Sequence, residues 1–491
     1  MAWAIHRRII RDGLKAVADQ ERIRKALIQK AKHTTFAKDH TFHEIKTVQD
    51  FRERIPIKDY EQLRPYFDRV AKGEADVLWP GKPKYLAKTS GTTSGVKYIP
   101  ITRDSVANHF NTARDASINH AYLAENLQIF DGKLIFLSGS PTLTETGGIK
   151  TGRLSGIVNH EVPSWVKGNQ LPSYETNCID DWELKLDKIV NETHNQDLRM
   201  ISGIPPWVQM YYEKLLQKTG AKSIKELFPN FSQFTYGGVN FEPYRSSLEK
   251  LTGGTILTLE TYPASEGFIA YQDQVTNNGL LLNTNSGIYF EFVPADQIQY
   301  ENPDRVGLEK VELHKDYALI INSNAGLWGY SIGDTVQFVS MDPYRILVSG
   351  RIKHFISAFG EHVIGKEVDQ AVLELSQRFR LSISEFTVAP QVNPSEGEAP
   401  YHEWFIEFAE RPKDLRELEL YLDSSLQRQN IYYRDLRNGK VLDCARITVL
   451  ATDSFRKYMD SKGKLGGQNK VPRLSNDRIL VEELIRLTQL N

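Results

Sequence analysis

The chain has 491 residues, of which 40% are hydrophobic and 25% charged, as is ordinary for a globular protein of about two to four domains. A formal net charge of −1 gives no electrostatic reason to expect nucleic acid or an anionic membrane as a partner, and no apolar stretch is long enough to predict a membrane span. The two cysteines, Cys178 and Cys444, are too few for a disulfide framework, so we expect buried, reduced thiols in a cytoplasmic protein.

Helical spacing of apolar residues dominates the first part of the chain. Residues 5 to 32 predict a helix whose buried stripe consists of Ile9, Leu14, Ala18, Ile23 and Leu27. A further helix is predicted from Asp59 to Ala71.

The segment from Thr89 to Lys97 is rich in hydroxyl side chains, with two glycines and one lysine. Glycines let backbone N–H groups converge on an anion, hydroxyls add donors, and Lys97 adds a mobile positive charge. Its spacing, Gly91-x3-Gly95-x-Lys97, differs from that of the common P-loop. A flexible surface linker is the alternative, but the apolar residues on both sides favour a phosphate-binding loop between structured elements.

Short apolar runs alternate with helical patterns from residue 134 onward. Four runs, at 134–137, 200–201, 234–236 and 256–259, each lead into a polar or glycine-rich turn. This pattern is typical of buried strands in α/β proteins, where ligands gather at the carboxyl ends of the strands.

The pattern changes near Gly350–Arg351. After it we predict a helix at 366–379, strands at 383–390 and around 404–408, a helix with leucines at 415, 418, 422 and 426 on one face, and a strand at 445–450. We therefore predict an α/β protein with a large N-terminal domain of β-sheets and flanking helices (residues 1–350) and a small, mobile α+β C-terminal domain (residues 351–491).

Two acidic residues follow apolar runs at positions suited to nucleotide chemistry. Glu266, in Tyr262-Pro263-Ala264-Ser265-Glu266-Gly267, is a candidate Mg²⁺ ligand at a strand end, although an exposed turn glutamate is the alternative. Asp334, in Tyr330-Ser331-Ile332-Gly333-Asp334, could accept hydrogen bonds from a ribose diol, although an Ile-Gly-Asp motif is more often only a turn.

Basic residues mark two further segments. Arg351 and Lys353 lie at the predicted domain break, where a hinge or a basic surface turn fits the sequence. Lys470 follows a pair of glycines near the end of the chain and could reach a phosphate or acyl group. The neighbouring Lys462 and Lys464 leave the choice of lysine open.

The order of these motifs resembles the adenylate-forming superfamily of acyl-CoA synthetases and luciferases. Within it, the details are similar to the plant auxin-responsive Gretchen Hagen family of acyl-acid–amido synthetases. The matching segments are Thr89 to Gly95, Tyr262 to Glu266, Tyr330 to Asp334 and Asn469 to Arg473. The resemblance spans nearly the whole chain, which is shorter than we expect of a plant member, so we expect a bacterial relative.

This resemblance implies a two-step ligase that uses ATP and Mg²⁺ to form an acyl-adenylate and then transfers the acyl group to an amine. It assigns the phosphates to Ser90, Gly91, Thr92, Thr93 and Ser94, with Lys97 nearby. It places Gly237, Gly238 and Tyr262 at the adenine, Asp334 at the ribose hydroxyls, Arg351 at the ribose or α-phosphate, and Glu266 on Mg²⁺. Lys353 is then the hinge and Lys470 the catalytic lysine that domain rotation brings in.

The acid and the acceptor stay open at this point. For the acyl pocket the sequence offers only an aromatic segment with Trp207, Met210 and Tyr211, and core packing explains such a segment more often than substrate contact does. The first motif resembles both amido synthetases and acyl-CoA synthetases, so the acceptor is an amino acid or the thiol of CoA. A nucleotide-binding protein without turnover is a third interpretation. We expect a monomer that binds its small-molecule substrates and neither nucleic acid nor a membrane.

Overall fold

The structure is a computed structural model that describes residues 1–92, 95–162, 167–238, 241–276, 278–298, 300–352, 355–361, 363–395, 398–412, 414–462 and 471–489. At residues 90–92, 95, 206, 242–243, 351, 355, 366 and 488–489 it describes the backbone alone. Lys353, Thr93, Ser94, Lys464 and Lys470 thus lie outside the described residues.

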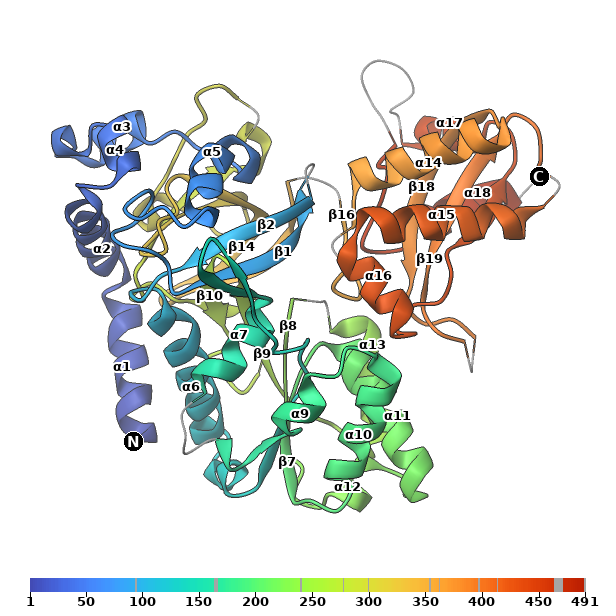
Figure 1. Cartoon of the computed structure of the whole chain (residues 1–491), viewed down its shortest axis with the longest axis horizontal. Helices are drawn as coiled ribbons and strands as arrows, with labels where there is room; N and C mark the ends of the chain where they lie inside the picture. The colour runs from blue at the N-terminus through green and yellow to red at the C-terminus, as the bar shows by residue number, and fades with distance from the viewer. Residues whose placement is uncertain are drawn as a thin grey trace.

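A mixed sheet of eleven strands forms the centre of the large N-terminal part (Figure 1). Its order is β12-β13-β14-β15-β11-β10-β9-β8-β7-β3-β6. The strands are β3 (Lys133–Phe136), β6 (Gln170–Leu171), β7 (Leu198–Ser202), β8 (Gln233–Gly237), β9 (Leu257–Ala264), β10 (Gly267–Tyr271), β11 (Leu280–Leu282), β12 (Ile288–Pro294), β13 (Asp316–Ser323), β14 (Tyr330–Met341) and β15 (Tyr344–Arg351).

The five strands from β6 to β9 pair in parallel, and the remaining pairs are antiparallel. Helices connect the parallel strands, as crossovers between them require. They are α9 (Tyr174–Asn177), α10 (Trp182–Thr193), α11 (Pro205–Thr219), α12 (Ile224–Leu227) and α13 (Glu242–Thr252), drawn in green at the lower right of Figure 1. All four predicted strands exist, and the α/β fold class is confirmed.

Two of the predicted turns belong to strands instead. Strand β9 was expected to end near residue 259, but it continues to Ala264 because it pairs with β10 as well as with β8. The segment Ile332–Asp334, expected to be a turn, lies inside β14. Gly333 has a φ of 92°, and the next residue, Asp334, already pairs with β15. A second neighbouring strand, which a single segment does not reveal, extends both elements.

A smaller sheet, in the order β2-β1-β5-β4, carries the hydroxyl-rich segment. Its strands are β1 (Tyr85–Thr92), β2 (Gly95–Ile101), β4 (Thr144–Thr146) and β5 (Ile149–Gly152), and α5 (Tyr60–Ala71) and α7 (Leu154–Glu161) pack on it, whereas α6 (Val106–Leu123) packs on β9 and β10 of the large sheet. The helix predicted at 59–71 is confirmed as α5, with Asp59 as its N-cap.

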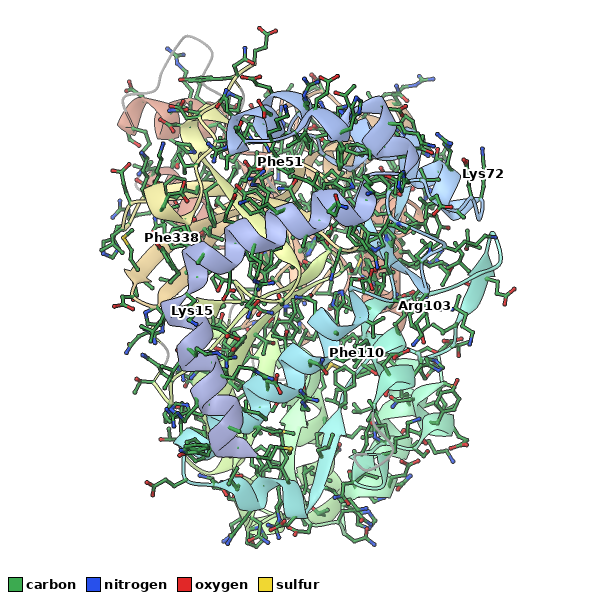
Figure 2. All side chains as sticks on the ribbon, turned by 90° about the vertical axis from the view of Figure 1, so that its left-hand side faces the viewer. Lys15, Phe51, Lys72, Arg103, Phe110 and Phe338 are labelled. Atoms are coloured by element: carbon green, nitrogen blue, oxygen red, sulfur yellow. The ribbon has the colours of Figure 1, made fainter. Side chains whose placement is uncertain are left out.

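Two helices replace the single one predicted over residues 5 to 32. They are α1 (Ala2–Leu14) and α2 (Ala16–Ala31), which meet at Lys15, and they run along the face turned to the viewer in Figure 2. Leu14 and Ala18 of the predicted stripe are exposed, because at about 100° per residue they point about 140° and 180° away from Ile9, whereas Ile9, Ile23 and Leu27 share one face and are buried as expected. Gln20 is buried instead and bonds the backbone of residues 284, 288 and 290.

The remaining N-terminal elements are short. They are α3 (Thr35–Asp39), α4 (Val48–Arg54), η1 (Phe42–Glu44), η2 (Leu127–Asp131), η3 (Ala295–Gln297) and η4 (Leu308–Lys310).

The C-terminal part is a separate α+β module built on the three-stranded sheet β18-β19-β20. Its elements are β16 (Phe355–Ile356), β17 (Val363–Ile364), α14 (Gly365–Phe379), β18 (Ile383–Gln391), β19 (Tyr401–Phe408), α15 (Leu415–Gln429), α16 (Ile431–Asn438), β20 (Arg446–Leu450), α17 (Ser454–Ser461) and α18 (Ile479–Gln489). All five elements predicted for it are found. The boundary at 350/351 and the mobility of the module stay predictions, although β15, which ends at Arg351, is the last strand of the large sheet.

The β16–β17 hairpin joins the module to the helices of the parallel half. The Tyr244 hydroxyl of α13 donates to the Ala358 carbonyl at 3.1 Å, and an added Cβ at Gly360 would lie 3.6 Å from the Ile204 side chain. One hydrophobic cluster accordingly contains residues of both parts, among them Tyr244 and Phe359.

The buried pair of Glu361 and His402 fixes the hairpin on the module side, with Oε1 and Nε2 2.8 Å apart. Within the described part of the chain, no helix has the length and apolar character needed to cross a membrane.

The Asp59 cap gives a direct test of α5. Its carboxylate accepts from the Gln62 backbone N–H at 3.1 Å, and the Gln62 side chain accepts from the Asp59 N–H at 2.9 Å. We expect Asp59→Ala to lower the free energy of unfolding in urea by about 1 kcal/mol, and Asp59→Asn, which keeps an accepting oxygen, by a few tenths. Equal losses in both variants would contradict the capping role.

Candidate active site

The β1–β2 hairpin, which carries the hydroxyl-rich segment, is attached to α5 at its base. Thr89 pairs with Lys97 and Thr92 with Gly95, and the ladder is irregular between Thr89 and Thr92. The Tyr98 backbone N–H donates to the Tyr60 hydroxyl at 2.9 Å, and the Lys97 ammonium lies 5.7 Å from the centre of the Tyr60 ring. Burial raises the pKa of Tyr60 to about 12, so the hydroxyl stays protonated. The Lys97 cation thus lies where the strand leaves the loop.

A column of aromatic rings runs from this hairpin to the large sheet. Tyr60 stacks on Phe67 with ring centres 4.7 Å apart, and Phe67 meets the edge of Tyr330 at 6.2 Å. The fully buried Tyr330 hydroxyl donates to Glu266 Oε1 at 3.2 Å. Burial, followed by the charge of Glu266, raises the pKa of Tyr330 well above its ordinary value, so this hydroxyl remains a donor. Packing therefore connects Lys97 and Glu266, which are 169 residues apart in the sequence (266 − 97).

Glu266 lies in the turn between β9 and β10 and is only 8% exposed, so the alternative of an exposed turn glutamate is wrong. Its described hydrogen bond comes from a neutral phenol, and no described cation lies within ion-pair distance of it. A buried carboxylate with this environment fits a hard cation such as Mg²⁺. The described residues contain no group of three or more metal-ligating side chains, so phosphate oxygens and water would complete the coordination.

Tyr262 on β9 and Asp334 on β14 contact each other directly, although three strands separate β9 from β14 in the sheet order. The Tyr262 hydroxyl donates to Asp334 Oδ2, and both side chains are buried. Asp334 on β14 is also the cross-strand partner of Arg351 on β15. The structure therefore brings together three positions that the sequence assigned to the nucleoside.

Gly237 and Gly238 end β8 beside the Tyr262 segment. Gly237 pairs with Thr261, and a Cβ on Gly237 would lie 2.3 Å from the Thr261 carbonyl oxygen, so no other residue fits there. Gly238 has a φ of 76° with no atom near its absent side chain. The two glycines leave a surface without side chains next to Tyr262, which would suit close contact with a planar base.

The aromatic segment on α11 is largely core. Tyr211 is completely buried and shares a hydrogen bond of 2.7 Å with Thr193, and the Trp207 ring lies 4.6 Å from that of Trp182. A role of Trp207, Met210 and Tyr211 in an acid pocket stays a prediction.

Helix α16 of the C-terminal module contacts the β1–β2 hairpin and Arg153. The Tyr432 hydroxyl donates to the Lys88 carbonyl at 2.9 Å, the Arg153 guanidinium lies 4.4 Å from the Tyr432 ring, and Arg153 pairs with Asp435. Lys462, one of the alternative lysines, forms an ion pair of 2.6 Å with Glu483. Catalytic roles for Lys470 and for the hinge Lys353 stay predictions, since both lie outside the described residues.

Lys185 is a buried lysine that sequence reasoning missed. From α10 its ammonium donates to the carbonyls of Ser138 and Asn177 at 2.9 and 2.8 Å, and it thereby holds the turn at the carboxyl end of β3. Burial lowers the pKa of Lys185 to about 8. A lysine amid the leucines and isoleucine of an amphipathic helix could have signalled this position.

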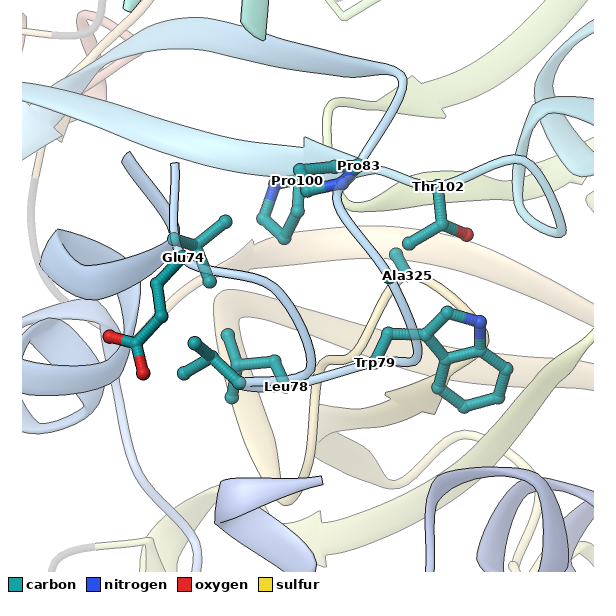
Figure 3. Close-up of a pocket in the computed structure, with 10 residues that line it drawn as sticks. Glu74, Leu78, Trp79, Pro83, Pro100, Thr102 and Ala325 are labelled. Carbon is teal, nitrogen blue, oxygen red and sulfur yellow. The ribbon is translucent and has the colours of Figure 1, made fainter. Parts of the chain in front are cut away.

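A shallow hollow lies on the other side of the β1–β2 sheet, lined by Leu78, Trp79, Pro100 and Thr102 among others (Figure 3). It encloses only about 10 Å³, room for about one water, and none of the predicted site residues lines it. The candidate site is therefore the region around Glu266, Tyr262 and Asp334.

Comparison with solved structures defines the class of this fold. AtGH3.15 acyl acid amido synthetase in complex with 2,4-DB aligns with a TM-score of 0.63 over 100% of this chain and 96% of that chain, at 16% identity. The fold is that of the acyl acid amido synthetases.

Family models match most of the chain. The GH3 family N-terminal domain matches residues 7–175, the GH3 family central domain residues 281–351, and the GH3 family C-terminal domain residues 366–479. The chain belongs to the GH3 family, and the resemblance inferred from its motifs is confirmed.

Curated relatives from plants are distant. The jasmonoyl–L-amino acid synthetase JAR4 of Nicotiana attenuata is 24% identical over 58% of this chain and 60% of its own length. The indole-3-acetic acid-amido synthetase GH3.15 of Arabidopsis thaliana is 23% identical over 90% of this chain and 87% of its own.

A double-mutant cycle tests the Tyr262–Asp334 contact. We expect Tyr262→Phe and Asp334→Asn to be non-additive in the free energy of unfolding, with a coupling of about 1.5–3 kcal/mol for a hydrogen bond to a carboxylate. The same cycle with Tyr262→Phe and Asp435→Asn, on different parts of the molecule, serves as the additive control. Additivity in both cycles would show that the contact contributes nothing.

The buried ammonium predicts a pH dependence of stability. Between the folded pKa of about 8 and the ordinary value of 10.5, the unfolded chain binds more protons at Lys185, so the free energy of unfolding rises with pH over this window. We expect Lys185→Met to lose this part of the rise in urea titrations, whereas Lys188→Met, on the exposed side of the same helix, keeps it.

Proposed function

We propose that this protein is an ATP-dependent acyl-acid amido synthetase, which activates a carboxylic acid as its acyl-adenylate and joins it to the amine of an amino acid. The observation that carries the proposal is that packing and hydrogen bonds connect the β1–β2 hairpin, the buried Glu266 and the Tyr262–Asp334 pair. Membership of the GH3 family and the names of its relatives support this activity.

In the first step a carboxylate oxygen of the acid attacks the α-phosphorus of ATP, the bond to the β-phosphate breaks, and pyrophosphate leaves. Such a transfer needs positioning and positive charge more than covalent help. The hairpin backbone from Ser90 to Ser94 would hold the phosphates, with Lys97 supplying charge at its base. Lys470 would add charge at the reacting phosphate.

The nucleoside would lie beside the residues of β8, β9 and β14 described above. Gly237 and Gly238 would face the adenine, with Tyr262 beside it, and Asp334 would accept from the ribose hydroxyls near Arg351. Since Tyr262 holds one oxygen of Asp334, the carboxylate is already oriented before ribose arrives.

Mg²⁺ would bind Glu266 and neutralise charge on the phosphates. Tyr330 keeps the Glu266 carboxylate in a single orientation in the absence of any described cationic partner.

In the second step the amine nitrogen attacks the acyl carbon, AMP leaves, and the nitrogen loses a proton. Both cysteines are free thiols in the structure, which supports the expected cytoplasmic location.

The test is ATP–pyrophosphate exchange with Mg²⁺ across a panel of aryl, indolyl and aliphatic carboxylic acids. We expect exchange that depends on the acid, followed by AMP release and an amide product, identified by mass spectrometry, when amino acids are added. A thioester with CoA in place of the amide would instead assign the chain to the acyl-CoA synthetases. ATP binding with no exchange for any acid would contradict an adenylating enzyme.

Substitution of Glu266 separates its metal role from a structural one. We expect Glu266→Gln to lower the exchange rate on the order of 10²-fold and to raise the Mg²⁺ concentration needed, because a metal ion contributes several kcal/mol to such a transition state. Tyr330→Phe keeps the carboxylate and should retain most of the activity. An unchanged Mg²⁺ dependence in Glu266→Gln would remove Glu266 from the metal site.

A further inference from the structure

Helix α1 carries apolar side chains on two faces, and the fold uses only one of them. Ile5 and Ile9 are buried in a cluster with residues of α6, β10 and β11. Trp3, Ile10 and Leu14 are 58%, 50% and 71% exposed. At about 100° per residue, these three project within about 40° of one another and well away from Ile5 and Ile9. Val17, 41% exposed at the start of α2, continues the exposed stripe.

This stripe is unusual for the molecule. Among the described residues, nineteen large apolar side chains are exposed, and five of them, Met1, Trp3, Ile10, Leu14 and Val17, fall within the first seventeen residues. Single exposed apolar side chains are normal on protein surfaces, whereas a cluster of this kind indicates an interaction surface.

The same two helices concentrate positive charge. Residues 1–33 contain nine Lys or Arg and three Asp or Glu, a net charge of +6 (9 − 3), so the rest of the chain carries −7 (−1 − 6). Arg7, Arg11 and Lys15 are exposed next to the apolar stripe. Arg7 lies 4.9 Å from the Trp3 ring, and no described carboxylate is within ion-pair distance of Arg7 or Lys15. The side of α1 that faces solvent is therefore apolar and cationic.

We propose that α1 and the start of α2 dock this protein on an anionic lipid surface. The exposed Trp3, Ile10 and Leu14 enter the interface between headgroups and acyl chains, and the flanking cations meet the headgroup phosphates. Figure 2 shows α1 and α2 running along one face of the molecule and meeting at Lys15, so both helices approach a planar surface together. The net charge of −1, on which the expectation of no membrane partner rested, averages over this asymmetry.

The charge and the apolar stripe together select this occupant. A symmetric contact with a second copy of the chain would bring the exposed Arg7, Arg11 and Lys15 against the same cations of that copy. Nucleic acid would satisfy the cations but would leave the apolar stripe in water. An anionic bilayer satisfies both features.

The experiment is flotation of the full chain with vesicles of phosphatidylcholine alone or with added phosphatidylglycerol. We expect binding to the anionic vesicles at about 0.1 M salt and its loss at about 1 M salt, where the screening length falls from about 10 to about 3 Å. Leu14→Glu and Lys15→Glu should each weaken the binding about tenfold, through the apolar and the electrostatic contribution respectively.

Two matched substitutions control for charge and for folding. Leu420→Glu on α15 changes an exposed leucine outside the stripe, and Lys188→Glu on α10 changes an exposed lysine; both should bind as the unaltered chain does. Thermal melting confirms that the variants fold, and the comparison of the two vesicle types needs no variant.

No binding to anionic vesicles at low salt, or binding that Leu14→Glu and Lys15→Glu leave intact, would overturn the proposal. So would binding to duplex DNA without binding to vesicles. A dimer that Leu14→Glu converts to a monomer in size-exclusion chromatography would assign the face to a second copy and overturn it as well.

Discussion

The buried ring of Tyr330, whose hydroxyl donates to Glu266, is the packing element on which the candidate site depends. Tyr330 begins β14, whose fifth residue is Asp334, and it packs through Phe67 on the tyrosine that holds the phosphate hairpin. A shift of this one ring would move Glu266, Asp334 and the β1–β2 hairpin relative to each other. The site is therefore built on core packing and does not depend on the flexibility of its loops.

The sequence predicts the elements of this fold well where each carries its own signal. The apolar runs at 134–137, 200–201, 234–236 and 256–259 are buried strands because both faces of a parallel sheet are covered, and the leucine stripe of α15 is buried at Leu418, Leu422 and Leu426. The helix at 59–71 begins at a capping residue, Asp59. Wherever pattern and packing agree locally, the prediction holds.

The errors come from information that lies elsewhere in the chain. Strand β9 extends to Ala264 because β10 pairs with its last residues, and the Ile332–Asp334 segment is strand because β15 lies beside it. The failure of the predicted stripe at Leu14 is local instead, because a spacing of five residues turns Leu14 about 140° away from Ile9 on the same helix. The burial of Glu266 depends on Tyr330, 64 residues later, so no local pattern could have distinguished a metal ligand from an exposed turn.

The junction between the two parts of the molecule has a thermodynamic consequence. Tyr244, Phe359 and their neighbours belong to one apolar cluster that spans the junction, so any swing of the C-terminal module away from α13 exposes apolar surface to water. The free energy that opposes such exposure weakens on cooling, because hydration of apolar surface carries a large heat capacity. For a C-terminal module that is mobile, as the sequence predicts, cold would therefore favour release.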